Sequence, residues 1–506
     1  MPIPLVNSIA SWFLKKRFDQ IELFLKYPNE VQNELLFHLL YTAKDTEIGK
    51  RYGFGTITNY KTFSERVPIS SYEDYQDIIE RSRNGESNIF WPNPIKWFAK
   101  SSGTTNAKSK FIPVSSESLE ECHYAASKDL LCMYLNNNED AQLFTGKSLR
   151  LGGSKELYKE NGTVFGDLSA ILIDNMPFWA EFSSTPSSKV SLMSDWEQKM
   201  QAIVDETRNE NVTSLAGVPS WMLVLLNNVL DSTGADSLFD VWPNLEVYFH
   251  GGVSFVPYED QYKAILPKSN FKYYEIYNAS EGFFAIQDQN NSSELLLMLD
   301  YGIFYEFIPM DVYGNPNQNV IPLSEVEVGK NYAVIITTNA GLWRYKIGDT
   351  VRFTSIDPYR IKVSGRTKHH INAFGEELII ENAEAALKEV CFSTNAEIVD
   401  YTAAPIFMNG KAKGSHEWLI EFKKAPDNIE QFNQLLDSAL QSLNSDYEAK
   451  RLNNMTLNMP KIHVARERLF YDWLKKCNKL GGQHKIPRLS NSREYMDELL
   501  DLNKAT

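Results

Sequence analysis

The chain has 506 residues, of which 43% are hydrophobic and 23% are charged. At a prior of roughly 150 residues per domain, this length predicts two or three domains with a full core, and it excludes a small peptide-like module. Lys and Arg (51) against Asp and Glu (65) give a net charge of -14, which argues against nucleic acid or an anionic membrane surface as the main partner.

The four cysteines are far apart in the sequence and form no CxxC pair, which is typical of a reducing, cytoplasmic setting. The amino terminus has a short apolar stretch, but its charges follow that stretch and no small-residue cleavage site comes after it. No uncharged apolar run approaches the roughly 18 residues that a membrane span needs. We therefore expect a cytoplasmic protein without a membrane partner.

The first elements in the chain are helical. Apolar residues recur at helical spacing from Leu5 to about Lys50, with an interruption at Pro28, and this periodicity predicts an amphipathic helical opening. The middle of the chain then alternates helices, such as 194–208, with β-like runs. These runs are LEVYFHGG (245–252), FKYYEIYNAS (271–280), LLLMLDYGIFYEFIP (295–309) and NYAVIITT (331–338). Such alternation predicts an α/β domain with more than one sheet.

The pattern changes after Gly365. We expect helices at 381–390 and 429–443 and strands at 396–403, 417–423 and 461–465, followed by a further helix. A separate α+β domain of about 130 residues fits the usual domain size. The sequence thus predicts a large domain over 1–364, a short hinge at 365–376 and a small domain over 377–506.

The stretch SSGTTNAKSKF (101–111) combines serine and threonine hydroxyls, a glycine and two lysines. A backbone that wraps an anion needs glycine for unusual dihedral angles, hydroxyl and amide donors, and a cation. The stretch is therefore a candidate phosphate loop. Taken alone, it is more often a solvent-exposed loop.

The stretch YNASEG (277–282) ends a predicted strand and places an aromatic ring, a hydroxyl and a carboxylate in one turn. Such a turn can stack a base, bond a phosphate and hold Mg²⁺ through Glu281. The alternative for Glu281 is a role in capping a following helix.

Two later stretches add single charged candidates. In GLWRYKIGDTVRF (341–353), Asp349 follows a glycine that is predicted to open a turn, and its carboxylate can accept the two hydroxyls of a ribose; the alternative is an ordinary turn residue. In GGQHKIPRL (481–489), Lys485 lies between a glycine pair and a proline near the end of the small domain. A lysine on a separate domain can approach phosphates across a cleft, whereas a lone lysine is usually a solvated surface residue.

These motifs occur in the order found in adenylate-forming enzymes, the superfamily of acyl-CoA synthetases, luciferases and peptide-synthetase adenylation domains. Nearly the whole chain resembles the auxin-responsive acyl acid amido synthetases of plants and their bacterial relatives, and GLWRYKIGD with the GGQHKIPRL ending points to that branch. The resemblance implies an α/β fold with a large multi-sheet adenylate-forming N-terminal domain and a small α+β C-terminal domain.

The resemblance also implies site residues, with ATP and Mg²⁺ as cofactors. Glu281 and Lys485 would be catalytic, and Glu281 would also bind the metal. The nucleotide would be bound by Ser101, Ser102, Gly103, Thr104, Thr105, Tyr277, Ala279, Ser280, Asp349 and Arg366. Arg366 would stand at the hinge, seventeen residues after Asp349.

The implied activity is ATP-dependent joining of a small carboxylic acid to an amino acid through an acyl-adenylate. An acyl-CoA ligase that shares the adenylation step and a non-catalytic relative that binds a nucleotide or a small acid are the alternatives. The acid, the amino acid and the oligomeric state are not indicated by the sequence.

Overall fold

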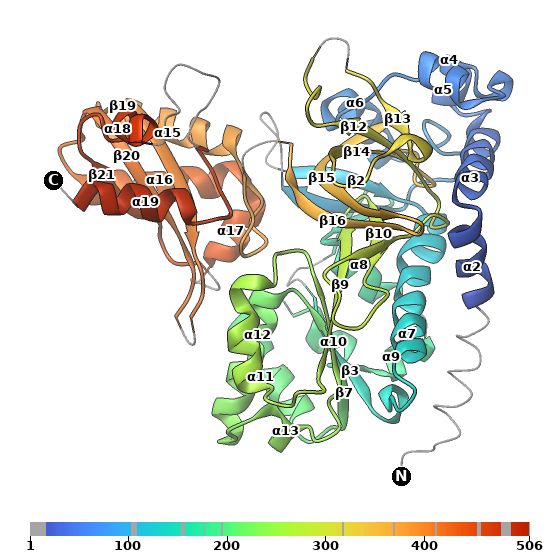
Figure 1. The fold of residues 1–506 in the computed structure, drawn as a ribbon, viewed down its shortest axis with the longest axis horizontal. Coiled ribbons are helices and arrows are strands. Elements are labelled where there is room, and N and C mark those ends of the chain that lie inside the picture. Colours follow the sequence, from blue (N-terminus) through green and yellow to red (C-terminus); the bar gives the residue numbers. More distant parts are fainter. Residues whose placement is uncertain are drawn as a thin grey trace.

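The computed structural model describes residues 17–102, 109–152, 157–176, 178–193, 196–315, 318–367, 370–409, 412–452, 457–476 and 487–504. A large N-terminal lobe and a smaller C-terminal lobe lie side by side, with the first helices on the far side of the large lobe (Figure 1). The predicted α/β class with a small α+β lobe is confirmed.

The helical opening is confirmed for its described part. It consists of α2 (Phe18–Lys26), α3 (Pro28–Ala43) and α4 (Glu47–Tyr52); residues 5–16 lie outside the described part of the chain. Proline at the start of α3 fits that position because the first turn needs no N–H donor. The buried Gln32 of α3 donates to the backbone oxygens of Leu299 (2.8 Å) and Ile303 (2.9 Å), which fastens the helix to the main sheet.

The main sheet crosses the large lobe, and twelve of its strands lie in the described residues. In spatial order they are β13 (Ile321–Pro322), β12 (Ile303–Pro309), β14 (Asn331–Thr338), β15 (Tyr345–Ile356), β16 (Tyr359–Arg366), β11 (Leu295–Leu297), β10 (Gly282–Ile286), β9 (Lys272–Ala279), β8 (Val247–Gly251), β7 (Val212–Gly217), β3 (Lys147–Leu151) and β6 (Ser184–Thr185). Strands β6, β3, β7, β8 and β9 are parallel, so their carboxyl ends share one edge. Ligands of α/β folds bind at such edges.

Helices and short 3-10 turns pack around this sheet and connect its strands. They are η1 (Phe54–Thr56), α5 (Tyr60–Arg66), α6 (Tyr72–Arg83), the π-helical η2 (Ser118–Tyr124), α7 (Ala125–Asn137), η3 (Leu143–Thr145), α8 (Leu168–Asp174), α9 (Phe178–Phe182), α10 (Ser188–Ser191), α11 (Trp196–Thr207), α12 (Pro219–Thr233), α13 (Leu238–Val241), η4 (Val256–Tyr258), α14 (Glu259–Ile265) and η5 (Leu323–Glu325).

A second sheet carries the candidate phosphate loop. Its order is β2 (Ser109–Val114), β1 (Trp97–Ser102), β5 (Thr163–Gly166) and β4 (Tyr158–Glu160). Strands β1 and β2 are antiparallel, and their last pair is Ser102 opposite Ser109. The two ends of the candidate loop are therefore fixed at neighbouring positions.

The small lobe is an α+β unit built on a three-stranded sheet, β19 (Glu397–Ile406), β20 (Ser415–Lys424) and β21 (Lys461–Ala465). Its helices are α15 (Ile380–Thr394), α16 (Ile429–Leu443), α17 (Ser445–Arg451), α18 (Leu469–Lys476) and α19 (Glu494–Lys504). The short strands β17 (His370–Ile371) and β18 (Leu378–Ile379) pair at its entrance. Predicted bounds and observed bounds agree within a few residues, and those of α16 and β21 are identical.

The run 295–309 has β-structure as expected, divided into two strands, β11 and β12, and Gly302 in their connection adopts a left-handed φ of 69°. The expectation of a turn at Asp349 is wrong. Asp349 lies in β15 and not in a turn: Gly348, with a φ of 91°, forms a bulge where β14 pairs with β15, and the strand continues past it.

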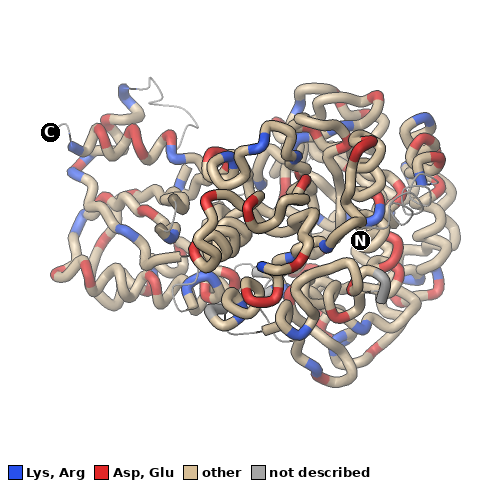
Figure 2. The backbone as a smooth tube through the Cα atoms, turned by 90° about the horizontal axis from the view of Figure 1, so that it is seen from below, with Lys and Arg blue, Asp and Glu red and all other residues tan. Residues whose placement is uncertain are grey.

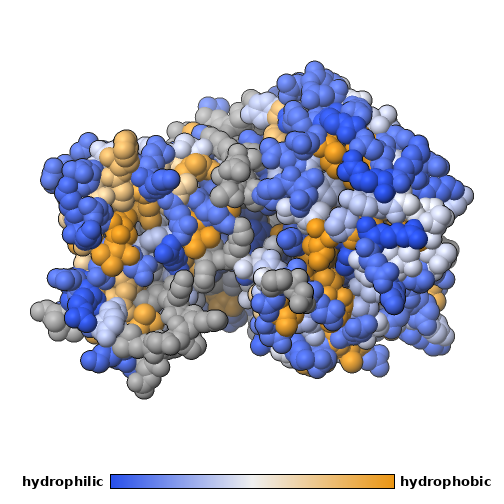
Figure 3. All heavy atoms as spheres, turned by 90° about the horizontal axis from the view of Figure 1, so that it is seen from above, coloured by the Kyte–Doolittle hydropathy of each residue, from blue (hydrophilic) through white to orange (hydrophobic). Residues whose placement is uncertain are grey.

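Charged side chains of both signs are interspersed along the chain (Figure 2). Apolar side chains gather in patches on one face of both lobes (Figure 3). Within the described residues, no helix combines the length and the apolar character that crossing a bilayer requires.

Candidate active site

The hairpin between β9 and β10 places Ser280 and Glu281 at the edge of the main sheet. Gly282 pairs with Ala279, so only Ser280 and Glu281 form the turn. The cap reading of Glu281 is wrong, because the residues after it form a strand and not a helix. An added Cβ at Gly282 would lie 2.6 Å from Ile303 Cδ1, so any other residue here would displace the buried Ile303 side chain.

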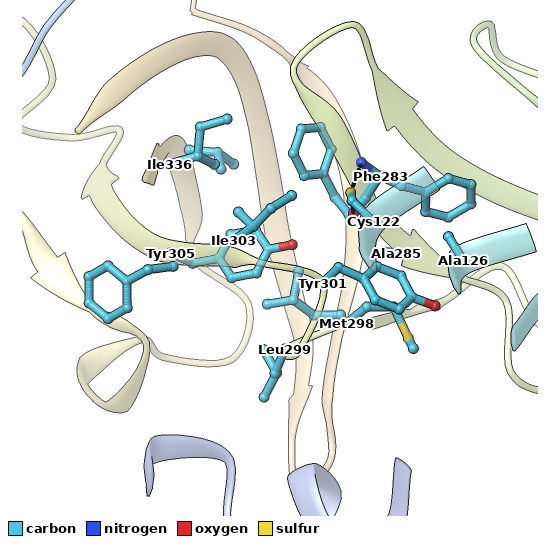
Figure 4. Packing of buried hydrophobic residues seen from close by; sticks show 14 of the residues in the cluster. Cys122, Ala126, Phe283, Ala285, Met298, Leu299, Tyr301, Ile303, Tyr305 and Ile336 are labelled. Atoms are coloured by element: carbon cyan, nitrogen blue, oxygen red, sulfur yellow. Dashed lines mark hydrogen bonds between the residues drawn. The ribbon is translucent and has the colours of Figure 1, made fainter. Parts of the chain in front are cut away.

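The hairpin packs against the hydrophobic core of the large lobe. Figure 4 shows Cys122 of η2 beside Phe283, whose backbone N–H donates to Cys122 Sγ at 3.2 Å. Tyr301 and Tyr305 are fully buried in the same cluster. A turn mounted on such close packing holds its carboxylate in one place.

The candidate phosphate loop begins next to this turn. Ser101 and Ser102 end β1, whereas Gly103, Thr104 and Thr105 lie outside the described residues. Lys110 stands opposite Ser101 on β2, and its charge partly offsets the rise that burial causes in the pKa of Glu281. The sequence analysis did not name Lys110 as a site residue, although it is one of the two lysines of the stretch 101–111.

Tyr277, Asp349 and Arg366 form one hydrogen-bonded array. The Tyr277 hydroxyl donates to Asp349 Oδ2 at 2.8 Å, and Arg366 Nε donates to Oδ1 at 2.9 Å. Burial and the neighbouring Asp349 charge raise the pKa of Tyr277 far above its usual value, so the tyrosine is a neutral donor. Arg366 pairs with Asp349 because β15 and β16 are antiparallel neighbours in this register.

Glu281 has an unusual titration. Burial raises its pKa to about 7, the Lys110 charge opposes this shift, and the charges of Glu377 and Asp349 add to it. The Tyr345 hydroxyl nearby is fully buried, and no described residue is its hydrogen-bond partner. Its pKa is raised by burial and then by the Glu281 charge, so this free donor lies close to the carboxylate.

The site fits a metal that is shared with phosphate oxygens. No group of three or more His, Cys, Asp or Glu side chains suited to a metal occurs within the described ranges. Mg²⁺ needs no such cage, because it is usually held by one or two carboxylates plus substrate phosphates. Glu281, next to the ends of the candidate phosphate loop, meets that requirement.

A contribution from the small lobe was not predicted. Glu377, immediately before β18, accepts from Arg366 Nη2 at 3.2 Å and from Nη1 at 3.5 Å. Burial lowers the pKa of Arg366, but the charges of Glu377, Asp349 and Glu281 outweigh this effect and raise it overall. One guanidinium therefore stands among three carboxylates.

The segment before Glu377 is held by both lobes. Its backbone oxygens accept hydrogen bonds from the large lobe, where Trp221 Nε1 donates to Phe374 O (3.0 Å) and the Tyr258 hydroxyl donates to Ala373 O (2.8 Å). On the small-lobe side, the fully buried Glu376 accepts from His416 Nε2 at 2.8 Å.

Lys485 lies outside the described residues. The chain that follows it is fixed to the small lobe, because Thr402 Oγ1 donates to Pro487 O (2.7 Å) and Ala403 N donates to Arg488 O (2.9 Å). Ala279 is the last residue of β9, and Ser280 lies in the turn that follows it.

The fold, a large α/β lobe with a small α+β lobe beside the Glu281 hairpin, is shared with ligases of known structure. Among solved structures, an acyl acid amido synthetase in complex with 2,4-DB, AtGH3.15, is similar over 97% of this chain and 96% of its own, with a TM-score of 0.63 at 18% identity. A 2-hydroxyisobutyryl-CoA ligase complex is similar over 95% and 93%, with a TM-score of 0.56 at 13% identity.

Family models match three parts of the chain: the GH3 family N-terminal domain at residues 17–271, the central domain at 296–366 and the C-terminal domain at 381–494. An indole-3-acetic acid-amido synthetase of Arabidopsis thaliana, GH3.3, is 24% identical over 579 residues that cover 98% of this chain and 95% of the relative. The chain belongs to the GH3 family.

Proposed function

We propose that the protein is an ATP-dependent acyl acid amido synthetase, a ligase that joins a small carboxylic acid to the amine of an amino acid. The observation that carries this proposal is the array in which Tyr277 and Arg366 hold the Asp349 carboxylate beside the Glu281 hairpin. Family membership supports the same activity, because the relatives bear the names of amido synthetases.

In the first half-reaction, the site must bring together a carboxylate and ATP, which repel each other. Ser101, Ser102, Gly103, Thr104 and Thr105 bind the phosphates as the candidate loop, and Asp349 accepts the ribose hydroxyls. Glu281 would hold Mg²⁺, which when bound neutralises phosphate charge. Lys485 stabilises the charge that develops as the acid oxygen attacks the α-phosphorus.

In the second half-reaction, the amine attacks the carbonyl carbon of the acyl-adenylate and AMP leaves. Tyr277 flanks the adenine, and Ala279 and Ser280 contact the nucleotide from the hairpin. Arg366 stands where β16 leads into the segment between the lobes. We assign the large domain to residues 1–364, the hinge to 365–376 and the small domain to 377–506, in a cytoplasmic protein whose partners are its small-molecule substrates.

The test is a screen of carboxylic acids crossed with the twenty amino acids, with pyrophosphate release measured and product masses recorded. We expect pyrophosphate release that depends on one class of acid and a product mass equal to acid plus amino acid less water. A CoA thioester formed faster than any amide would instead identify an acyl-CoA ligase. ATP binding without pyrophosphate release across the panel would identify a non-catalytic relative.

A further inference from the structure

We propose that the Tyr345 hydroxyl donates a hydrogen bond to the Glu281 carboxylate when the nucleotide is bound, and that this bond positions the carboxylate for Mg²⁺. The inference rests on the proposed function, because it deepens the metal-binding role that the proposed function gives to Glu281. It is carried by the unused hydroxyl of Tyr345, by its fixed ring and by the carboxylate beside it.

The Tyr345 side chain is fully buried, and its hydroxyl has no hydrogen-bond partner among the residues that the structure describes. A buried hydroxyl without a partner costs free energy, because it has lost its bonds to water and gained none from the protein. Such groups are rare in folded proteins, and a ligand-dependent role is one explanation for them. The hydroxyl is therefore available to a partner that changes when a ligand binds.

The ring of Tyr345 is held in place. It lies edge-on to the ring of Tyr75, with 6.1 Å between the two ring centroids. The backbone on both sides of it is bonded to Ser70, because Ser70 N donates to Arg344 O (2.9 Å) and Lys346 N donates to Ser70 O (2.9 Å). The hydroxyl thus keeps one position, and its acceptor has to reach it there.

The Glu281 carboxylate is the acceptor that the surroundings of Tyr345 offer. Burial has the largest effect on the pKa of Tyr345 and raises it, the Glu281 charge comes second, and the charge of the exposed Glu73 acts less strongly. The hairpin fixes where the Glu281 side chain starts, and the terminal torsions of that side chain set where its two oxygens point. With the tyrosine fixed, the hydrogen bond forms by rotation of the carboxylate.

The fully buried Tyr305 shows the contrast (Figure 4). Its hydroxyl also lacks a described partner, but the carboxylate whose charge acts on it, Asp300, is paired with Arg17 at 2.7 Å. Glu281 is in no ion pair within the described ranges. Its oxygens therefore keep the capacity to accept from Tyr345.

One carboxylate can serve both partners. Its two oxygens offer about four lone pairs, so a cation and a hydroxyl can be bound at the same time. Carboxylates that bind metals are themselves held by further hydrogen bonds, and loss of such a bond typically lowers metal affinity by roughly 10–100-fold. The Tyr345 hydroxyl would supply that bond to Glu281.

The experiment measures the dissociation constant for ATP by calorimetry, with Mg²⁺ and in EDTA, on the full chain without an acid substrate. It compares the wild type with Tyr345→Phe, Glu281→Ala and the double variant. Tyr305→Phe, which removes an equally buried hydroxyl, is the control for Tyr345→Phe. Glu389→Ala, which removes an exposed carboxylate of α15, is the control for Glu281→Ala. Urea unfolding without nucleotide reports the stability of each protein.

We expect the dissociation constant for ATP with Mg²⁺ to rise about tenfold in Tyr345→Phe, because the metal-binding carboxylate loses the bond that holds it. In EDTA, and in the Glu281→Ala background, loss of the hydroxyl should change the constant by less than about twofold, since a residue that acts through another has no effect once that one is gone. Without nucleotide, the urea midpoint of Tyr345→Phe should equal or exceed that of the wild type, because the hydroxyl that is removed has no partner there.

Four results would overturn the inference. An unchanged constant would remove Tyr345 from the site. An equal loss with Mg²⁺ and in EDTA would mean that the hydroxyl contacts the nucleotide itself. A loss that persists in the Glu281→Ala background would mean that it acts on another group. A lowered urea midpoint in Tyr345→Phe but not in Tyr305→Phe would make it a structural residue. A wild-type protein that binds no ATP would overturn the proposed function as well, and this outcome is recognised before any variant is studied.

Discussion

The Tyr277 hydroxyl donates to Asp349 Oδ2 at 2.8 Å across strands that are far apart in the sequence. Asp349 is 8% exposed and Tyr277 is 7% exposed, so water does not replace this bond when it is lost. Both carboxylate oxygens of Asp349 are engaged, since Arg366 binds the other one. The orientation of the candidate ribose ligand therefore depends on a tyrosine and an arginine together.

Removal of the Tyr277 hydroxyl should weaken ATP binding. In Tyr277→Phe we expect the KM for ATP to rise about tenfold, because a hydrogen bond to a buried charged group contributes roughly 1.5–3 kcal/mol. Initial-rate kinetics at varied ATP measure this. Tyr273→Phe is the matched control on the same strand, because no described residue bonds the Tyr273 hydroxyl. If the two variants had the same KM, the tyrosine would not orient Asp349.

Glu281→Ala should change the response to Mg²⁺. A methyl group offers no oxygen ligand to a hard cation, so we expect the Mg²⁺ concentration that gives half-maximal pyrophosphate release to rise at least tenfold. Metal titration at saturating ATP measures this, with Glu389→Ala as the control for loss of a carboxylate. An unaltered titration curve would show that Glu281 holds no metal.

The raised pKa of Glu281 also predicts a pH dependence of stability. Its pKa is about 7 in the folded protein and near 4.5 in the unfolded chain, so between these values the folded state binds more protons. The contribution of this group to the free energy of unfolding therefore falls as the pH rises from about 4.5 to about 7. Without nucleotide, Glu281→Gln should be more stable than the wild type by roughly 1–3 kcal/mol at pH 8 and should match it near pH 4. Urea unfolding at both pH values measures this; a constant difference would refute the shift.

Local sequence patterns predicted most of the elements, because hydrophobic periodicity marks a helix such as α16 and a β-branched and aromatic run marks a strand such as β14. The pairing of strands that are distant in the sequence is not indicated by any local pattern of residues. The strand position of Asp349 depends on a bulge against β14, and the partner of Arg366 in the small lobe depends on how the lobes meet. Of the candidate site, sequence reasoning therefore named Glu281 and Asp349 but missed Lys110 and Glu377.

Lys485 should separate the two half-reactions. If the lysine acts only in the adenylation transition state, Lys485→Ala should reduce pyrophosphate release at least 100-fold. It should convert a supplied acyl-adenylate to the amide at a rate close to that of the wild type. Single-turnover assays of each half-reaction measure this. A parallel fall of both rates in a folded variant would contradict a role confined to adenylation.

Loss of the His416 side chain should lower the free energy of unfolding substantially. Its partner Glu376 is fully buried, so His416→Ala leaves a buried carboxylate short of a partner, and we expect a loss of roughly 3 kcal/mol in the free energy of unfolding. His463→Ala is the control, because His463 is 30% exposed and its partner Glu417 keeps Arg493. We expect that control to lose less than about 1 kcal/mol. Equal losses would mean that burial of the pair contributes nothing.

The bonds from the large lobe to the hinge and the small lobe have a consequence for domain exchange. Trp221, Tyr258 and Gln261 all donate to backbone oxygens, those of Phe374, Ala373 and Met408. Every amino acid carries a backbone oxygen, so these three bonds depend on the path of the accepting chain and not on its side chains. A small domain transplanted from a divergent family member should therefore keep these three bonds, whereas the contacts of Trp221 with Lys450 and of Tyr258 with Phe407 also require matching side chains.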